Sequence, residues 1–401
     1  MKILMLTPYL PYPLHSGGQI RSYNLLKNLS QNHQITLFSF IRSKSETKHI
    51  KELKKFCHKV KVFRRRKAWD PRNIILSGLT PYPFLVSIYF SKDVKTAILK
   101  ELQTSDYDLI HAETFYVMPN LPSSVKLPTL LVEQTIEYAV YQRYVKDFKL
   151  FFLKPLLYFD VFKIKFWEKY YWNKATRLIA MSASDKAIMQ RSVKGRKVNV
   201  VANGVDIDHF SAKCRSSSGR NLRKPKNPTV LFVGNFKWLP NKDAAKFLVG
   251  KIWPIIKKKL PNAKLWIVGR NPTKDILKLQ VDKSILVTGN LEDIRTAFKT
   301  SSVLLAPIRN GRGTKYKVLE AMASQTPVVT TKLGIEGVEA QGSVLVAEEA
   351  QGLAEKTIKV LLNKKLAQTL SNKAKKIVDS KYNWKAISKQ LDNIYLELGG
   401  A

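Results

Sequence analysis

The stretch NGRGTKYKVLEAMASQTPVV, residues 310–329, decides the fold that we expect for this chain. A glycine-bracketed loop with two lysines is followed by a short apolar helix that carries one carboxylate, Glu320, and then by a β-branched run. Backbone N–H groups in such a loop and the positive end of a helix dipole both favour negative charge. The pattern therefore predicts a phosphate site where the loop meets the helix.

Short apolar runs alternate with helical segments around this stretch. Strands are expected at 229–235, 263–270, 284–290, 302–308 and 326–332, with helices at 242–260 and 292–301. This alternation predicts a parallel sheet covered by helices. In such sheets ligands bind beyond the carboxyl ends of the strands.

The N-terminal half repeats the pattern, with a helix at 21–32 and strands at 2–6, 35–40, 60–65, 107–113, 129–134, 175–182 and 198–204. We expect an α/β fold with two Rossmann-like, doubly wound domains facing a cleft. The first domain covers residues 1–205, and a polar, basic linker covers 206–228. The second domain covers 229–380, and a C-terminal helix at 381–401 is expected to pack back toward the first domain.

Composition limits the class of protein. The chain has 401 residues, of which 45% are hydrophobic, which is enough for two domains. Its two cysteines, Cys57 and Cys214, give neither a disulfide framework nor a metal-binding spacing. The apolar N-terminal run is too short for a signal peptide, and no run approaches the roughly 18 residues of a membrane span. We therefore expect a cytoplasmic protein.

The formal net charge of +39 attracts anions at long range, whether nucleic acid, anionic membrane or phosphorylated metabolite. Residues 138–172 hold 14 aromatic residues, seven basic and three acidic ones. These aromatics either pack between two helices, with Pro155 as an interruption, or enter a lipid headgroup region while lysines meet anionic lipid. A second basic segment, 42–67, favours the membrane interpretation and a peripheral location on the inner membrane face.

Glycines follow several of the expected strands: Gly17 and Gly18 in HSGGQ, Gly234 in FVGNF and Gly269 in IVGR. Glycine there lets the backbone approach a ligand closely. The Gly17–Gly18 pair does not form a GxGxxG dinucleotide fingerprint, and the sequence contains no GxxxxGK[ST] phosphate loop. A phosphate-bearing ligand must therefore be held by other means.

The motifs together resemble those of the two-domain GT-B glycosyltransferases of the large retaining group 4 type. They are PYPLHSGGQIRSYNLLKNL (11–29), YDLIHAETF (107–115), VVANGVDIDHF (200–210), VLFVGNFKWLPNKDAAKFL (230–248), LWIVGRNP (265–272), VTGNLEDI (287–294) and, above all, GRGTKYKVLEAMASQTPVVTTKLGIEGV (311–338). The resemblance covers nearly the whole chain. It implies transfer of a sugar from a nucleotide-sugar donor, bound mainly by the second domain, to an acceptor bound by the first.

The resemblance assigns donor-binding residues. Glu320 would grip ribose hydroxyls, since a carboxylate can accept two hydroxyl hydrogen bonds at once, and Lys317 would face the diphosphate. The other expected donor-binding residues are Gly17, Gly18, Gly234, Asn235, Lys237, Gly269, Arg312, Gly313 and Thr314. The alternative is that Glu320 is an exposed helix residue with Lys317 as its i, i+3 partner.

Arg312 departs from the pattern of many relatives, which have a glutamate eight positions before the one that matches Glu320. Other branches have a Gly-rich G-T-x-x-K loop there, which this sequence resembles. Activity is therefore not excluded, although a cation at this place would suit an acidic sugar or an extra phosphate. A catalytically silent GT-B scaffold stays open as an alternative.

In the first domain the resemblance points to His111 and Glu113 as candidate catalytic residues. Strand alternation places both on one face, and spacing favours Glu113 for the active-site position, whereas His111 can also be a strand-end residue. The expected acceptor-binding residues are His15, Gln134 and Glu137.

We expect a hexosyltransferase with a nucleoside-diphosphate sugar as donor substrate and no permanently bound cofactor. No DxD-like pair follows a strand at the cleft, so we expect no metal. Relatives commonly act on lipid-linked saccharides at the inner face of a bacterial membrane, in cell-surface polysaccharide or lipopolysaccharide synthesis. A basic nucleic-acid-binding protein is the rival class, but no nucleic-acid-binding motif is present.

Overall fold

The computed structural model describes residues 1–212, 225–311, 315–340 and 342–400. The chain divides into two compact units, the first formed by Met1–Ala202 with Ile387–Ala401 and the second by Asn203–Ala386. The boundary at Ile387 falls within the last helix, α17 (Trp384–Gly399). Most of this C-terminal helix is therefore part of the first unit.

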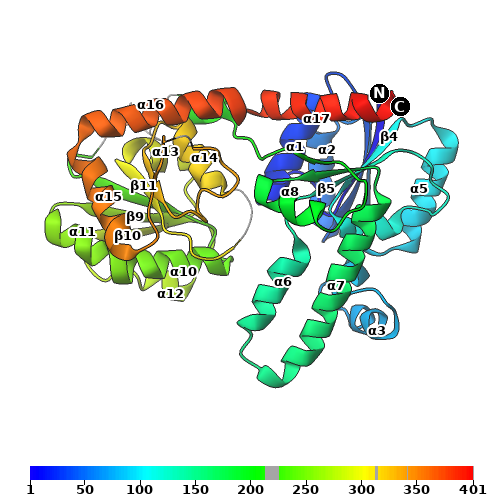
Figure 1. Cartoon of the computed structure of the whole chain (residues 1–401), viewed down its shortest axis with the longest axis horizontal. Helices are drawn as coiled ribbons and strands as arrows, with labels where there is room; N and C mark the ends of the chain where they lie inside the picture. Colours follow the sequence, from blue (N-terminus) through cyan, green and yellow to red (C-terminus); the bar gives the residue numbers. More distant parts are fainter. Residues whose placement is uncertain (213–224, 312–314, 341, 401) are drawn as a thin grey trace. The chain divides into compact units, whose positions relative to one another are not determined.

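The first unit contains a seven-stranded parallel sheet with the order β3-β2-β1-β4-β5-β6-β7. Continuous apolar runs form its central strands, because both faces are covered by helices (Figure 1). The strands are β1 (Lys2–Thr7), β2 (Gln34–Ile41), β3 (Lys59–Arg64), β4 (Leu109–Glu113), β5 (Thr129–Glu133), β6 (Arg177–Ala180) and β7 (Val198–Val200). The predicted doubly wound fold is confirmed for this half.

The helices of the first unit connect these strands. The first begins after Ser16, whose hydroxyl accepts the N–H of Gln19 at 3.4 Å and so caps it. They are α1 (Gly17–Leu29), η1 (Lys44–His49), α2 (Ile50–Leu53), α3 (Pro71–Leu79), α4 (Phe84–Tyr89), α5 (Lys92–Thr104), η2 (Phe115–Asn120), α6 (Glu137–Lys146), η3 (Phe151–Leu153), α7 (Lys154–Lys174) and α8 (Ala183–Gln190).

The second unit contains a six-stranded parallel sheet with the order β10-β9-β8-β11-β12-β13. Its strands are β8 (Thr229–Val233), β9 (Lys264–Gly269), β10 (Ile285–Gly289), β11 (Val303–Ala306), β12 (Val328–Thr330) and β13 (Leu345–Val346). The predicted parallel sheet is confirmed. The two-residue β13 was not predicted, because a run so short gives no periodicity.

Helices cover the second sheet as well: α9 (Ile207–Ser211), α10 (Leu239–Phe247), η4 (Leu248–Ile252), α11 (Trp253–Lys259), α12 (Lys274–Leu277), α13 (Ile294–Thr300), α14 (Tyr316–Ala323), α15 (Ala350–Leu362) and α16 (Lys364–Lys381). The single helix expected at 242–260 consists of α10, a π-helical turn and α11. Pro254 lacks an N–H and so cannot continue the regular ladder there.

Helix α9 lies within the segment expected as a linker. The carboxylate of Asp206 caps it by accepting the N–H of His209 at 2.9 Å. Arg295 and Lys299 of α13 donate to the carbonyl oxygens of His209 and Ser211, at 3.0 and 2.9 Å. The start of the expected linker is therefore ordered against the second unit.

Helices α6 and α7 form a hairpin that projects away from the first sheet (Figure 1). Pro155 does not interrupt α7 but occupies its first turn, where a missing N–H costs little. The alternative in which the aromatics pack between two helices does not hold for many apolar side chains of this segment, which are between 42% and 78% exposed: Tyr144, Leu150, Phe151, Phe152, Leu156, Tyr158, Phe159, Phe162, Phe166 and Tyr170.

The close approach of β8 and β9 predicts a stability effect. A Cβ added to Gly269 would overlap the carbonyl oxygen of Gly234, whereas one added to Gly250 would meet nothing within 4 Å. We expect Gly269→Ala to lower the melting temperature by roughly 5–10 °C, and Gly250→Ala to leave it unchanged or slightly higher. Scanning calorimetry of both variants checks this, and equal melting temperatures would contradict the packing described.

Candidate active site

In the first unit, β4 carries the two candidate catalytic residues. His111 and Glu113 are fully buried, and His111 Nε2 lies 3.3 Å from Glu113 Oε1. The two side chains therefore share a face, as strand alternation predicts. His111 Nδ1 lies 2.5 Å from the hydroxyl of Tyr395 on α17. These contacts fix the imidazole between a carboxylate and a phenol.

Gln134 follows the neighbouring strand, β5, and joins the same group. Its side-chain amide donates hydrogen bonds to Glu113 Oε2 and to the hydroxyl of Tyr9, which follows β1. A Cβ added to Gly18 would overlap both the Tyr9 hydroxyl and the Gln134 amide. Gly18 therefore makes room for these two side chains at the start of α1.

Arg21 and Tyr395 belong to this group but were missed by the sequence analysis. Arg21 on α1 is 1% exposed, and its Nη1 donates to the carbonyl oxygen of Ala202 at 2.8 Å. A signal for it exists, because Arg21 lies four positions before Leu25 and so on the apolar face of the helix. No local signal marks Tyr395, which reaches the site through tertiary packing.

The electrostatics of the group keep Glu113 ionised. Burial opposes ionisation, but the His111 imidazole, the charge of Arg21 and the Gln134 amide together hold the pKa of Glu113 below its ordinary value. The carboxylate is thus ionised and an acceptor of hydrogen bonds at neutral pH.

Glu137 lies in a second group of carboxyls. It is the first residue of α6, and its backbone N–H donates to Glu168 Oε1 of α7 at 2.8 Å. Burial raises the pKa of Glu137 to about 7. Burial also raises the pKa of Glu168 and of Glu133 well above the ordinary value. Glu137 therefore changes charge near neutral pH.

The remaining expected residues of the first unit lie before α1. His15 is exposed, and its backbone N–H donates to the carbonyl oxygen of Pro13 at 2.9 Å. Gly17 is the first residue of α1 and is partly exposed. Both stand at the positive end of a helix dipole.

In the second unit, α14 positions Lys317 and Glu320. Lys317 Nζ donates to Asn241 Oδ1 on α10 at 2.8 Å and lies 4.6 Å from the centroid of the Phe232 ring. This contact differs from the alternative in which Lys317 serves as an ion-pair partner of Glu320. Its ammonium group is directed instead to the carboxyl end of β8.

Both side chains titrate near neutrality. Burial, with repulsion from Lys315, lowers the pKa of Lys317 to about 7. Burial raises the pKa of Glu320 to about 7, although Lys317 and Arg270 oppose this. Arg270 lies directly after β9 and was missed by the sequence analysis. Its position as a cation at the end of a predicted strand could have indicated it. The site therefore combines a partly buried cation with a partly buried carboxyl.

The expected residues at the ends of β8 and β9 lie beside this pair. A Cβ added to Gly234 would lie 3.0 Å from Asn241 Cγ, the side chain that holds Lys317. Asn235 Oδ1 accepts the N–H of Lys237 at 3.1 Å, and the Lys237 side chain is exposed. The absence of a side chain on Gly234, directly after β8, thus leaves room for the Asn241 side chain.

Arg312, Gly313 and Thr314 lie outside the described residues. Among the described residues, no three His, Cys, Asp or Glu side chains are grouped so as to hold a metal ion. Within the same part of the chain, no helix combines the length and the apolar character needed to cross a membrane.

Comparison with known families matches both halves of the chain. The model of Glycosyltransferase Family 4 matches residues 15–209, and that of Glycosyl transferases group 1 matches residues 227–363. This chain belongs to the family 4 glycosyltransferases. The expected family is thereby confirmed. The first match covers most of the first unit and the first seven residues of the second, and the second match lies within the second unit.

Known relatives include the phosphatidyl-myo-inositol mannosyltransferase of Mycolicibacterium smegmatis, 24% identical over 82% of this chain and 83% of the relative. CapM of Staphylococcus aureus, a capsular polysaccharide biosynthesis glycosyltransferase, is 24% identical over 63% of this chain and 68% of its own length. The structure of Anabaena HepE in complex with UDP and glucose has a TM-score of 0.62 at 17% identity, covering 99% of this chain and 100% of HepE. That likeness confirms the GT-B fold.

Glu113 and Glu137 should affect stability in opposite directions. The lowered pKa of Glu113 means that its stabilisation is present above about pH 4.5 and is lost as the pH falls through the folded-state pKa. The raised pKa of Glu137 means that its carboxyl destabilises the fold increasingly from pH 4.5 to about 7.

We therefore expect Glu113→Gln to lower the melting temperature at pH 8 and Glu137→Gln to raise it. Each kcal/mol of change in the free energy of unfolding should shift the melting temperature by roughly 2–4 °C. Both differences should shrink at pH 4. Thermal unfolding of the three proteins at the two pH values checks this. Shifts of the same sign at pH 8 would contradict the assigned environments.

Proposed function

We propose that this glycosyltransferase moves a sugar from a nucleoside-diphosphate sugar, bound by the second unit, to a saccharide or lipid-linked acceptor, bound by the first. One observation carries the proposal: α14 presents a partly buried cation, Lys317, and a partly buried carboxyl, Glu320, with the Lys317 ammonium held at the carboxyl end of β8 by Asn241 and Phe232. A nucleotide offers the matching groups, phosphate for the cation and ribose hydroxyls for the carboxylate.

The chemistry follows from the charges. When the glycosidic bond to the donor breaks, negative charge develops on the departing β-phosphate. Lys317 can stabilise that charge from its fixed position, as can the N-terminal amides of α14. Because the protein supplies this positive charge itself, we propose that transfer proceeds without a metal ion.

In the first unit, Glu113 would face the acceptor. Its carboxylate is ionised and can accept a hydrogen bond or proton from the attacking hydroxyl, while His111 and Gln134 keep it oriented. Retention of anomeric configuration is part of the proposal and is supported by the resemblance to the retaining group. The named activities of the M. smegmatis and S. aureus relatives support a role in bacterial cell-surface glycan synthesis.

Nucleotide affinity should follow a bell-shaped pH profile. The phosphate needs protonated Lys317, so affinity falls as the pH rises above about 7. The ribose needs ionised Glu320, so affinity also falls as the pH drops below about 7. Calorimetric titration of UDP, GDP and ADP from pH 5.5 to 9 checks this for whichever nucleotide binds.

Two matched variants test the acid and alkaline limbs of this pH profile separately. Lys317→Gln should abolish the alkaline limb and weaken binding, and Glu320→Gln should abolish the acid limb. A profile that neither variant changes would show that other groups govern nucleotide binding.

We also propose that the protein binds the surface of anionic phospholipid bilayers through the α6–α7 hairpin. The hairpin exposes phenylalanines, among them Phe151 at 78% and Phe162 at 65%. Exposed lysines lie near them, including Lys146 at the end of α6 and Lys149 between the helices. Aromatic side chains beside lysines suit the boundary between acyl chains and anionic headgroups.

Removing three of these aromatics should release the protein from membranes. We expect Phe151→Ser/Phe152→Ser/Phe159→Ser to reduce binding to phosphatidylglycerol-containing vesicles by at least about tenfold. Each substitution removes an aromatic ring that would otherwise be buried in the lipid. Leu362→Ser/Val281→Ser, which removes exposed apolar side chains from the second unit, is the matched control. Co-sedimentation measures both, and equal binding of the two variants would contradict the assignment.

A further inference from the structure

A basic cavity of about 510 Å³ lies at the carboxyl end of β3, the edge strand of the first sheet. Its walls come from the residues after β3, from α3, from the end of α4 and from the start of α5. The charged side chains that line it are Arg64, Arg65, Arg66, Lys67, Asp70, Arg72 and Asp93. Five cations against two carboxylates leave an excess of positive charge inside the cavity.

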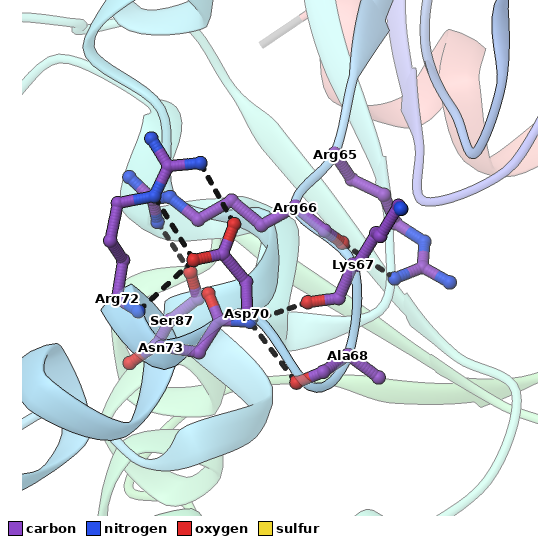
Figure 2. Close-up of polar contacts among 8 residues, drawn as sticks. All are labelled: Arg65, Arg66, Lys67, Ala68, Asp70, Arg72, Asn73 and Ser87. Carbon is purple, nitrogen blue, oxygen red and sulfur yellow. Dashed lines mark hydrogen bonds and ion pairs between the residues drawn. The ribbon is translucent and has the colours of Figure 1, made fainter.

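Two of these guanidinium groups are held in place without a carboxylate (Figure 2). Arg66 Nη1 donates to the carbonyl oxygen of Ser87 at 2.6 Å, and Arg65 Nη1 donates to that of Arg66 at 2.9 Å. Arg72 is different, because its Nη2 pairs with Asp70 Oδ2 at 2.8 Å. The cavity thus contains cations held by backbone carbonyl oxygens, and its two carboxylates are too few to balance its five positive charges.

Arg64 and Lys67 complete the cavity as exposed side chains. Among the described residues, neither side chain has a hydrogen bond or an ion pair. Guanidinium forks and an ammonium group that converge on one polar cavity match the oxygens of a phosphate or diphosphate group.

Aromatic rings connect this cavity to the candidate acceptor region. The Arg65 guanidinium lies 5.6 Å from the ring of Tyr89, which lines the cavity. Tyr89 packs against Tyr116 with ring centroids 4.7 Å apart. Burial raises the pKa of Tyr116, and the nearby Glu137 carboxyl adds to this. Arg65 and Glu137 therefore both lie near this aromatic pair.

Exposed apolar side chains lie next to the cavity. Asp70, which lines it, caps α3, and α3 exposes Ile74 and Ile75 at more than half of their surface and Leu79 at 84%. Trp69, directly before the cap, is 86% exposed. A ligand with a phosphate in the cavity could lay an apolar chain along these side chains.

We propose that this cavity binds the phosphate or diphosphate group of the acceptor. The inference rests on the proposed function, because it assumes that the first unit holds the acceptor. The same phosphate chemistry occurs in a lipid-linked saccharide and in a soluble sugar phosphate. The exposed apolar side chains of α3 favour the lipid-linked source.

The test uses three probes: inorganic pyrophosphate, farnesyl diphosphate and farnesol. Each is titrated by calorimetry into the wild-type chain, the cavity variant Arg64→Gln/Lys67→Gln and the control Arg191→Gln/Lys194→Gln. The control removes the same charge from exposed side chains after α8, between β6 and β7. Lys317→Gln identifies any diphosphate that binds the donor site instead.

We expect the cavity variant to weaken farnesyl diphosphate binding by at least about tenfold, with the control and Lys317→Gln unchanged at this site. Tighter binding of farnesyl diphosphate than of pyrophosphate supports a lipid-linked source. Equal binding of the two supports the phosphate site but overturns that source. If the cavity variant and the control lose the same amount of farnesyl diphosphate affinity, the inference is overturned. It is also overturned if Lys317→Gln is the only variant that removes diphosphate binding.

Failure of this inference can be told apart from failure of the proposed function. If nucleotides bind through Lys317 and Glu320 but the cavity variant behaves as the control, only the phosphate cavity is overturned. If diphosphate binding depends on the cavity but no nucleotide binds the second unit, the donor-site proposal is overturned.

Discussion

The ammonium group of Lys317 lies between the amide oxygen of Asn241 and the ring of Phe232, where burial opposes its charge. Neither contact neutralises a cation, so an anion that enters beside it gains a strong, poorly screened interaction. The geometry depends on packing below it: Gly234 leaves room for Asn241, and Gly269 leaves room for the backbone of Gly234. A parallel sheet that ends in glycines thus allows a charged group to be held at its carboxyl edge.

The sequence predicts what is local and periodic. Buried parallel strands are continuous apolar runs, so both sheets can be located, and the loop, lysine and carboxylate around Glu320 share one short helix. The first-unit site is only partly predictable, because Arg21 bonds Ala202 and His111 meets Tyr395 across 181 and 284 residues of sequence. The exposure of Phe151 and Phe162 also follows from tertiary structure, since a helix period alone does not say what covers a face.

Positive charge gathers at three places, each with its own surroundings. Lys317 is desolvated and suits a nucleotide phosphate, whereas the cavity after β3 holds fixed guanidinium groups and suits a phosphate ester. The hairpin lysines lie among exposed phenylalanines and suit a membrane surface. A glycosyltransferase whose donor is a nucleotide and whose acceptor is lipid-linked would use all three. The formal charge of +39 is consistent with such a set of anionic partners.

The central claim is that Lys317 and Glu320 bind the nucleotide of the donor, and thermal unfolding tests it most directly. The wild-type chain and Glu320→Gln are unfolded with UDP, GDP, ADP, CMP and their common sugar conjugates, because a ligand specific for the native state must raise its stability. The account predicts that one nucleotide family raises the melting temperature of the wild type and raises that of the variant much less. No shift with any nucleotide, or equal shifts in both proteins, would contradict it.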